Sequence, residues 1–346
     1  MRASPDKQAG SGGLETGLEG APTRQMAVYT EIGDDELRAF IAAYDIGEVL
    51  SCKGIAEGVE NSNYLLATER GSFILTLYEK RVAPGDLPFF IALMDHLAHQ
   101  GVACPTPVRA KDGAALRELC GRPAAIVTFL NGMWPRRIVP FHCAGVGAAL
   151  ARLHRAGESF AMTRPNDLGI AGWHRLYVAC ASRADEVQKG LQAELHDELE
   201  ALEAAWPQGL PSGVIHADLF PDNVFFRDRE LSGLIDFYFA CTDAFAYDLA
   251  ICINAWCFEP DGDFNVTKAR LLVGHYRGER ALSAAEIVAL PLLARGSALR
   301  FLLTRLYDWL NQTEGALVRP KDPLEYLRKL RFHRGIADPS GYGIDP

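Results

Sequence analysis

The sequence predicts an α+β protein with two lobes, a small one built on an antiparallel sheet and a larger one that is mainly helical. Short runs rich in Leu, Ile, Phe and Tyr precede residue 131, and long helical patterns follow it. The 346 residues are enough for two lobes. We therefore expect an N-terminal lobe at 26–131 and a helical C-terminal lobe at 132–346.

Residues 1–25 differ in composition from the rest of the chain. They are rich in Gly, Ala, Ser, Thr and Pro, with no apolar periodicity and no apolar stretch of the kind found in a signal peptide. We expect a disordered extension there, followed by the compact protein.

The bulk composition bounds the class of protein. A hydrophobic content of 49% and a charged content of 23% are typical of a folded soluble protein. The net charge of -9 argues against a nucleic-acid or anionic-membrane partner. The eight cysteines form no C-x-x-C pair, which favours reduced thiols in a cytoplasmic protein over a zinc site.

The smaller lobe is expected to contain two strands joined by a tight turn, a helix and a further buried strand. Glu69-Arg70-Gly71 separates two runs with strand composition, which indicates a hairpin. The expected elements are a helix capped by Asp34, strands at 63–68 and 72–79, a helix from Asp86 to Gly101, and a strand at 124–129.

The larger lobe is expected to be helical around a few short strands. The helices are predicted at 139–156, 173–189, 191–206, 247–257, 267–277, 284–312 and 322–334. Three apolar runs at 214–216, 224–226 and 233–236 are too short for helices and are expected to be strands beside a site.

The strongest chemical signal lies within these short strands. His216-x-Asp218-x-x-x-x-Asn223 is followed by an apolar run that ends in Asp236-Phe237. A kinase needs one carboxylate to orient or deprotonate the attacking hydroxyl, and further oxygen ligands that hold Mg²⁺ against the phosphates. We assign the first role to Asp218 and the metal to Asn223 and Asp236, since Mg²⁺ prefers hard oxygen donors. His216, also part of the catalytic loop, is expected to order it by hydrogen bonding.

Each of these residues has a simpler explanation when taken alone. Asp218 and Asn223 are common turn residues, and single motif matches carry a false-positive risk. The set is more specific, because three polar side chains keep the kinase order and spacing between apolar strands. The pattern therefore favours a phosphotransfer site.

This loop resembles that of the aminoglycoside phosphotransferase and choline kinase superfamily. Over nearly all of residues 26–335 the chain is more narrowly similar to the bacterial homoserine kinases of this type. The stretches that carry the similarity are Gly58–Tyr64, Phe73–Glu79, Asp86–Phe90, Arg164–Gly169, Tyr247–Trp256, Leu299–Asp308 and Lys321–Tyr326.

The resemblance implies a bilobal, protein-kinase-like fold with ATP and Mg²⁺ between the lobes. It also implies an activity, the ATP-dependent phosphorylation of the hydroxyl group of L-homoserine to O-phospho-L-homoserine, a step toward threonine. The expected partner is then this small molecule alone. A monomer is favoured.

The nucleotide would be covered by the smaller lobe. Gly54 and Gly58 flank a turn before Asn63, where backbone amides could approach phosphates. An ordinary hairpin turn explains two glycines equally well. In the superfamily the segment at Thr128 and Leu130 is the hinge, whose backbone bonds the adenine, and the change of composition after this segment agrees with that role.

One position departs from the superfamily pattern. Kinases place a Lys or Arg on the strand that follows the glycine turn, where it pairs with the phosphates. Thr76 occupies this position here. Lys80, with Arg81, lies just beyond the strand and is the candidate replacement, although such residues are also common at solvated strand ends.

The acceptor site should offer an acid and a base for the two charges of homoserine. The candidates are Asn254, Trp256, Arg300 and Arg305, all in the larger lobe. For the arginines, interhelical salt bridges are an equally good explanation. Asp248, at the start of a helix, is expected to support the catalytic loop as an N-cap.

Two alternative functions remain open on the sequence. The acceptor could be another small alcohol, with an aromatic cage expected for choline and an acidic patch for an aminoglycoside. The missing strand lysine also motivates a different class, a catalytically degenerate kinase fold that binds nucleotides or serves as a scaffold. The intact Asp218, Asn223 and Asp236 argue against the second alternative.

Overall fold

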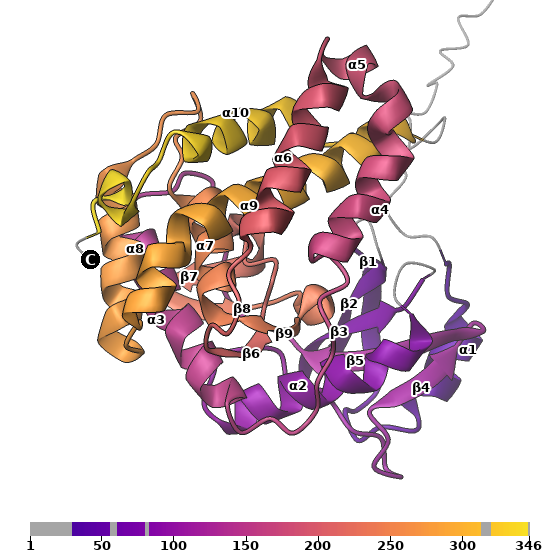
Figure 1. Cartoon of the computed structure of the whole chain (residues 1–346). Helices are drawn as coiled ribbons and strands as arrows, with labels where there is room; N and C mark the ends of the chain where they lie inside the picture. The colour runs from indigo at the N-terminus through magenta and orange to yellow at the C-terminus, as the bar shows by residue number, and fades with distance from the viewer. Residues whose placement is uncertain (1–29, 56–60, 80–82, 313–319, 345–346) are drawn as a thin grey trace, which may run out of the picture.

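The N-terminal part of the chain forms a five-stranded antiparallel sheet, at the lower right of Figure 1. The computed structural model describes residues 30–55, 61–79, 83–312 and 320–344. The strand order is β1-β2-β3-β5-β4. The strands are β1 (Val49–Gly54), β2 (Ser62–Thr68), β3 (Gly71–Leu77), β4 (Leu116–Leu119) and β5 (Arg122–Thr128).

The predicted hairpin is confirmed. Strands β2 and β3 pair in register from Ser62 opposite Leu77 to Thr68 opposite Gly71. Gly71 has a φ of 138°, a conformation that side-chain-bearing residues rarely adopt, so a glycine suits this turn. The buried strand β5 is also as predicted, whereas the edge strands β1 and β4 were not expected.

The two faces of the sheet belong to different parts of the hydrophobic core. Leu66, Leu75 and Ile126 pack on one face with helix α1 (Asp34–Ile41). On the other side, Ala125 and Val127 belong to one cluster with helix α2 (Leu87–His99) and the C-terminal helices. Helix α2 therefore joins the sheet to the larger, helical part of the molecule.

Helices dominate the chain after β5, as predicted. They are α3 (Pro140–Gly157), α4 (Ile170–Cys180), α5 (Ala184–Val187), α6 (Leu191–Ala205), α7 (Phe245–Trp256), α8 (Val266–Glu279), α9 (Ala284–Leu310) and α10 (Pro323–Arg334). The helix expected at 173–189 is instead divided into α4, a 3-10 turn and α5.

One predicted helix cap is wrong, and the other is confirmed in position only. The N-cap of α1 is Gly33, and Asp34 is the first helical residue. Asp86 occupies the N-cap position of α2 but makes no capping hydrogen bond. Its carboxylate accepts a hydrogen bond from Arg164 instead, at 2.8 Å.

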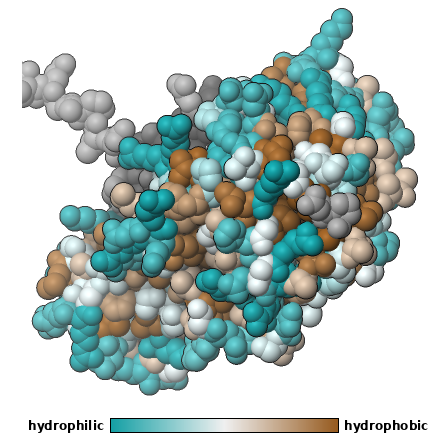
Figure 2. Space-filling model, turned by 90° about the vertical axis from the view of Figure 1, so that its left-hand side faces the viewer, coloured by the Kyte–Doolittle hydropathy of each residue, from teal (hydrophilic) through white to brown (hydrophobic). Residues whose placement is uncertain are grey.

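Helix α9 runs through the centre of the helical part. Among the described residues it is the helix that is long and apolar enough to cross a membrane by length and composition, but 72% of its most apolar stretch is buried inside the protein. Such burial is what the core helix of a globular protein requires. Hydrophilic and hydrophobic residues are interspersed over the face of the molecule that Figure 2 shows.

Four short strands lie between α6 and α7. Strand β6 (Ser212–Ile215) pairs with β9 (Cys241–Ala244), and β7 (Val224–Arg227) pairs with β8 (Glu230–Leu234), both antiparallel. The three predicted strands of this region are thus present. Two connections between them, β6 to β7 and β8 to β9, carry the residues of the kinase motif.

Candidate active site

The loop from β6 to β7 brings Asp218 and Asn223 together. It closes with a 3-10 turn at Pro221–Asn223. The amide Nδ2 of Asn223 donates to the backbone oxygen of Asp218 at 2.8 Å and lies 3.3 Å from its carboxylate Oδ2. Because Nδ2 is engaged in this way, Oδ1 of Asn223 is the atom left to act as a metal ligand.

Asp236 is held next to this pair by the backbone. It comes two residues after the end of β8, and the N–H of the intervening Ile235 donates to the backbone oxygen of Asn223 at 3.0 Å. Asp236 has a φ of 65°, in the left-handed region that Asp tolerates better than most residues. The three residues of the motif therefore meet on two connections that are hydrogen-bonded to each other.

His216 is a buried residue that orders the loop, as predicted. Its Nδ1 accepts from the N–H of Asp218 at 3.3 Å, and its Nε2 lies 3.0 Å from the carbonyl oxygen of Ile235. A carbonyl only accepts, so the ring is neutral with its proton on Nε2. Burial lowers the pKa of His216, which agrees with a neutral ring.

Asp248 of the next helix also holds this loop in place. Its carboxylate accepts hydrogen bonds from the N–H groups of His216 at 2.7 Å and Ala217 at 2.9 Å. Burial by itself would raise the pKa of Asp248, but the hydrogen bonds from His154 and from the N–H of His216 leave it lowered. The supporting role is as predicted, but Asp248 lies inside α7, whose N-cap is Ala244.

The loop backbone is also fixed by α7 and α9. Ala217 has a φ of 63°, which is strained for a residue with a side chain. Its carbonyl accepts a 2.5 Å hydrogen bond from Nη1 of Arg300. The indole Nε1 of Trp256 donates to the carbonyl of Leu219 at 2.8 Å. Side chains from two helices thus hold the backbone on either side of Asp218.

Three of the four predicted acceptor residues have structural contacts instead. Trp256 and Asn254 are fully buried. Asn254 donates to the carbonyl of Ala294 at 2.8 Å and accepts from the ring of His333. Arg305 pairs with Glu325 at 2.7 Å, an interhelical salt bridge between α9 and α10. Asn254 and Trp256 therefore contact other parts of the protein, whereas Arg300 lines a cavity beside the loop.

On the nucleotide side the structure describes part of the predicted set. Gly58 and Lys80 lie outside the described residues. The side chain of Asn63 accepts a hydrogen bond from the hydroxyl of Thr76 at 2.8 Å. Thr76, which stands where the superfamily pattern predicts a lysine, is therefore hydrogen-bonded to the neighbouring strand of the sheet. The backbone of Thr128 bonds Thr106 at 3.0 Å, and Leu130 packs against Gly233 of β8.

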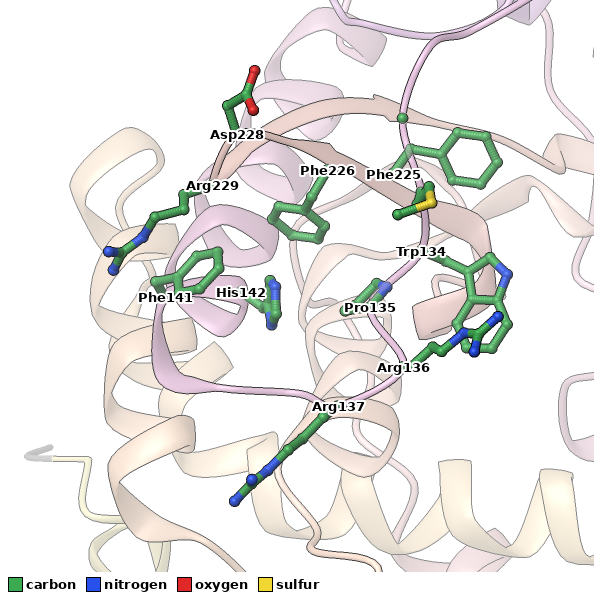
Figure 3. Close-up of a pocket in the computed structure, with 12 residues that line it drawn as sticks. Trp134, Pro135, Arg136, Arg137, Phe141, His142, Phe225, Phe226, Asp228 and Arg229 are labelled. Carbon is green, nitrogen blue, oxygen red and sulfur yellow. The ribbon is translucent and has the colours of Figure 1, made fainter.

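A pocket of about 510 Å³ adjoins this segment. Figure 3 shows Phe141, His142 and Phe226 on one side of it and Trp134 on the other. Its lining contains none of the motif residues Asp218, Asn223 and Asp236.

A second cavity, of about 350 Å³, lies beside the catalytic loop. Its lining includes Asp86 and Phe90 of the α2 region, Arg164 and Asp167 of the loop before α4, Tyr238, and Arg300. Tyr238 comes two residues after Asp236, and Arg300 binds the carbonyl next to Asp218. Asp218 and Asp236 are not among its lining residues, but Arg300 connects this cavity by a hydrogen bond to the loop that carries Asp218.

Comparison with known proteins gives a consistent answer. Residues 51–282 match the model of a phosphotransferase enzyme family. A homoserine kinase from Rhodospirillum rubrum is 64% identical over 92% of this chain and 99% of its own length. One from Bradyrhizobium diazoefficiens is 66% identical over 93% of this chain and 98% of its own. The chain belongs to the homoserine kinase branch of this phosphotransferase family.

Solved structures of low sequence identity share the fold. An amicoumacin kinase in complex with AMP-PNP and Ca²⁺ matches 90% of this chain and 94% of its own at a TM-score of 0.66, with 15% identity. A choline kinase from Cryptosporidium parvum matches 87% of this chain and 94% of its own at 0.62, with 13% identity. The bilobal, kinase-like α+β fold predicted from the sequence is thereby confirmed.

Several residues of the second cavity were not predicted as site residues from the sequence. Asp86, Arg164 and Asp167 lie in two stretches that carry the family resemblance, Asp86–Phe90 and Arg164–Gly169. Both stretches are charged and lie far from the kinase motif in the chain. Only the tertiary fold brings them together with Arg300 at one cavity, so the sequence does not reveal it.

Proposed function

We propose that this protein transfers the γ-phosphoryl group of ATP to the side-chain hydroxyl of L-homoserine, giving ADP and O-phospho-L-homoserine. The observation that carries the proposal is the high identity to curated homoserine kinases over nearly the whole chain. The juxtaposed Asp218, Asn223 and Asp236 motif supports it, because phosphoryl transfer depends on such a set.

Asp218 acts on the acceptor in this scheme. Its carboxylate orients the homoserine hydroxyl and takes its proton as the oxygen attacks the γ-phosphorus. The bond from that phosphorus to the bridging oxygen breaks, and ADP leaves with the electron pair. The transition state is loose, so most of the catalysis comes from positioning and electrostatics.

Asn223 and Asp236 fit a magnesium site by the chemistry of their donors. Asn223 keeps Oδ1 for a cation, and Asp236 is an exposed carboxylate next to it in the loop network. Hard oxygen ligands of this type suit Mg²⁺, which retains several waters. When bound, the ion would neutralise charge on the transferred phosphoryl group.

The domain organisation follows from the same proposal. Residues 26–131 form the lobe that covers ATP, and 132–346 form the lobe that carries the catalytic loop and the acceptor. The adenine lies against the backbone of the segment at Thr128 and Leu130. The predictions of a disordered segment at 1–25, a monomer and a cytoplasmic location stay predictions.

An acceptor panel tests the function directly. Purified protein is mixed with ATP, Mg²⁺ and one of several alcohols, and ADP release is followed with a coupled assay. We expect turnover with L-homoserine well above that with choline or an aminoglycoside. Turnover with another alcohol but none with homoserine would overturn the assigned substrate, and ATP binding without any turnover would favour the degenerate kinase.

A further inference from the structure

The cavity beside the catalytic loop contains an unusual arginine. Arg300 is 1% exposed, and its Nε has no hydrogen-bond partner within the described residues. Its Nη1 is used by the carbonyl of Ala217. Among the salt bridges of the described part of the chain, none involves Arg300. A buried guanidinium is costly unless an anion or further acceptors balance it.

Aromatic rings orient this guanidinium without neutralising it. The carbon Cζ of Arg300 lies 4.5 Å from the ring centroid of Phe301 and 5.9 Å from that of Phe239. Rings stabilise a cation by a small amount compared with a carboxylate in a desolvated site. The arrangement suits a carboxylate that arrives with a ligand.

The opposite charge gathers elsewhere in the cavity lining. Arg164 bonds two carboxylates, with Nε 2.8 Å from Asp86 and Nη2 2.5 Å from Asp167. One guanidinium shared by two carboxylates leaves this cluster with one net negative charge. The side chains of Asp86 and Asp167 are 34% and 60% exposed, so both carboxylates remain accessible to a cation.

The loop that carries Asp167 is held in place by its own hydrogen bonds. Nδ2 of Asn166 donates to Asp243 at 2.7 Å, and Oδ1 of Asn166 accepts from the N–H of Leu168 at 2.9 Å. Arg175 donates to the carbonyl of Asp167 at 2.9 Å. The negative cluster is therefore built on a fixed backbone.

We propose that this cavity is the acceptor subsite and that it recognises the zwitterionic head of a hydroxy amino acid. Arg300 binds the α-carboxylate, and Asp86 and Asp167 bind the ammonium group. The side-chain hydroxyl then extends to Asp218, whose neighbour Ala217 is bonded to Arg300. The assignment rests on the proposed function and explains its substrate class.

Charge balance distinguishes this ligand from the other acceptors of the fold. One positive and one net negative group match a molecule that carries one charge of each sign. Choline has no carboxylate and would leave Arg300 uncompensated. A polycationic aminoglycoside would meet the buried guanidinium with a like charge, which is unfavourable.

Two truncated acceptors test the two halves of the subsite. 3-Aminopropan-1-ol lacks the carboxylate of homoserine, and 4-hydroxybutanoate lacks the ammonium group. In Arg300→Met we expect kcat/KM for homoserine to fall about 100-fold more than that for 3-aminopropan-1-ol, which loses only the support that Arg300 gives to Ala217. In Asp86→Asn combined with Asp167→Asn, kcat/KM for homoserine falls while that for 4-hydroxybutanoate does not.

Controls separate recognition from loop support. Arg300→Lys keeps a positive charge and should recover part of the homoserine preference. Arg305→Met removes an arginine from the same helix that pairs with Glu325, so the ratio of the two acceptors should stay as in the unaltered protein. The KM for ATP should be the same in all variants that remain folded by circular dichroism.

Two results would overturn the assignment, and they differ from a failure of the proposed function. Equal losses for homoserine and 3-aminopropan-1-ol in Arg300→Met would make Arg300 a support of Ala217 only. Near-normal homoserine turnover in that variant would remove it from the site. If the unaltered protein ignores homoserine but phosphorylates another hydroxy amino acid, the function is wrong and the zwitterion subsite stands.

Discussion

The Nε2 atom of His216 lies 3.0 Å from the carbonyl oxygen of Ile235. This hydrogen bond joins the loop of the proposed catalytic base to the residue that precedes Asp236. His216 also accepts from the N–H of Asp218, so one neutral ring sets the position of both catalytic connections. It acts as a positioning residue, because its ring is buried and bonded on both nitrogens to the protein.

Replacing His216 tests this positioning role. In His216→Phe the two hydrogen bonds disappear while the ring volume is nearly kept. Misplacement of a catalytic group by about 1 Å can cost about 100-fold in rate, so we expect kcat to fall by about 10- to 100-fold. The KM values should change little. A loss confined to the KM for ATP, with normal kcat, would contradict the role.

Magnesium dependence tests the proposed metal ligands. In Asn223→Ala and Asp236→Ala one oxygen donor is removed, and the carboxylate matters more because it carries charge. We expect both variants to need more Mg²⁺ for half-maximal activity. The residual rate of Asp236→Ala should be at least about 100-fold below that of the unaltered protein. Activity is titrated with Mg²⁺ at fixed ATP.

Asp218→Ala is the matched variant for that experiment. It removes a carboxylate that acts on the acceptor, so turnover should be lost while Mg²⁺-dependent ATP binding survives. An unchanged Mg²⁺ requirement in Asp236→Ala would contradict the metal site, and normal turnover in Asp218→Ala would contradict the base.

The kinase motif could be predicted from the sequence because its residues are close together in the chain. Asp218 and Asn223 lie in one short loop, and the apolar strands on either side fix that loop. The hairpin of β2 and β3 was predictable for the same reason. Strands β1 and β4 were missed because they lie at the sheet edges, where partial exposure weakens the alternation of apolar residues.

The residues that bind the acceptor were harder to predict, because their role depends on the direction in which each side chain leaves its helix and not on the residue type alone. Arg300 and Arg305 are five residues apart in α9, so their side chains diverge by about 140° around the helix. One faces the catalytic loop and the other faces α10. Polar residues in an apolar helix, such as Asn254, give no sequence signal that separates a ligand contact from support of a neighbouring helix.

Close packing of α3 against α8 gives a prediction about stability. A Cβ added to Gly147 of α3 would lie 2.0 Å from the backbone oxygen of Leu272 in α8. The backbone cannot give way as a flexible side chain would. We expect Gly147→Ala to lower the free energy of unfolding by about 3 kcal/mol or more, measured by urea denaturation.

A second helical glycine provides the control. A Cβ on Gly274, in α8, would have no atom within 4 Å of it. Gly274→Ala should therefore raise the free energy of unfolding by about 0.5–1 kcal/mol through helix propensity. Equal effects of the two substitutions would contradict the close helix contact.

Buried histidines give the stability a defined pH dependence. Burial lowers the pKa of His333 to about 3, and the nearby Lys329 adds to this effect. Its Nδ1 lies 2.7 Å from the hydroxyl of Tyr342, and its Nε2 lies 3.0 Å from Oδ1 of Asn254. Burial also lowers the pKa of His154 and of His216. All three side chains are therefore neutral in the native state at pH 7.

The sign of the effect follows from proton binding. Below about pH 6.5 the unfolded chain protonates these rings while the native protein does not, so lowering the pH favours unfolding. Each histidine contributes a slope of up to about 1.4 kcal/mol per pH unit between its unfolded and native pKa. The free energy of unfolding from urea titrations should therefore fall steadily from pH 7 to pH 5.

His333→Gln isolates one of these contributions. The variant should be less stable at pH 7, because two buried hydrogen bonds change, but its stability should depend less steeply on pH by up to about 1.4 kcal/mol per unit. Identical slopes in His333→Gln and the unaltered protein would show that the ring of His333 is protonated in the native state, against its buried bonding to Asn254 and Tyr342.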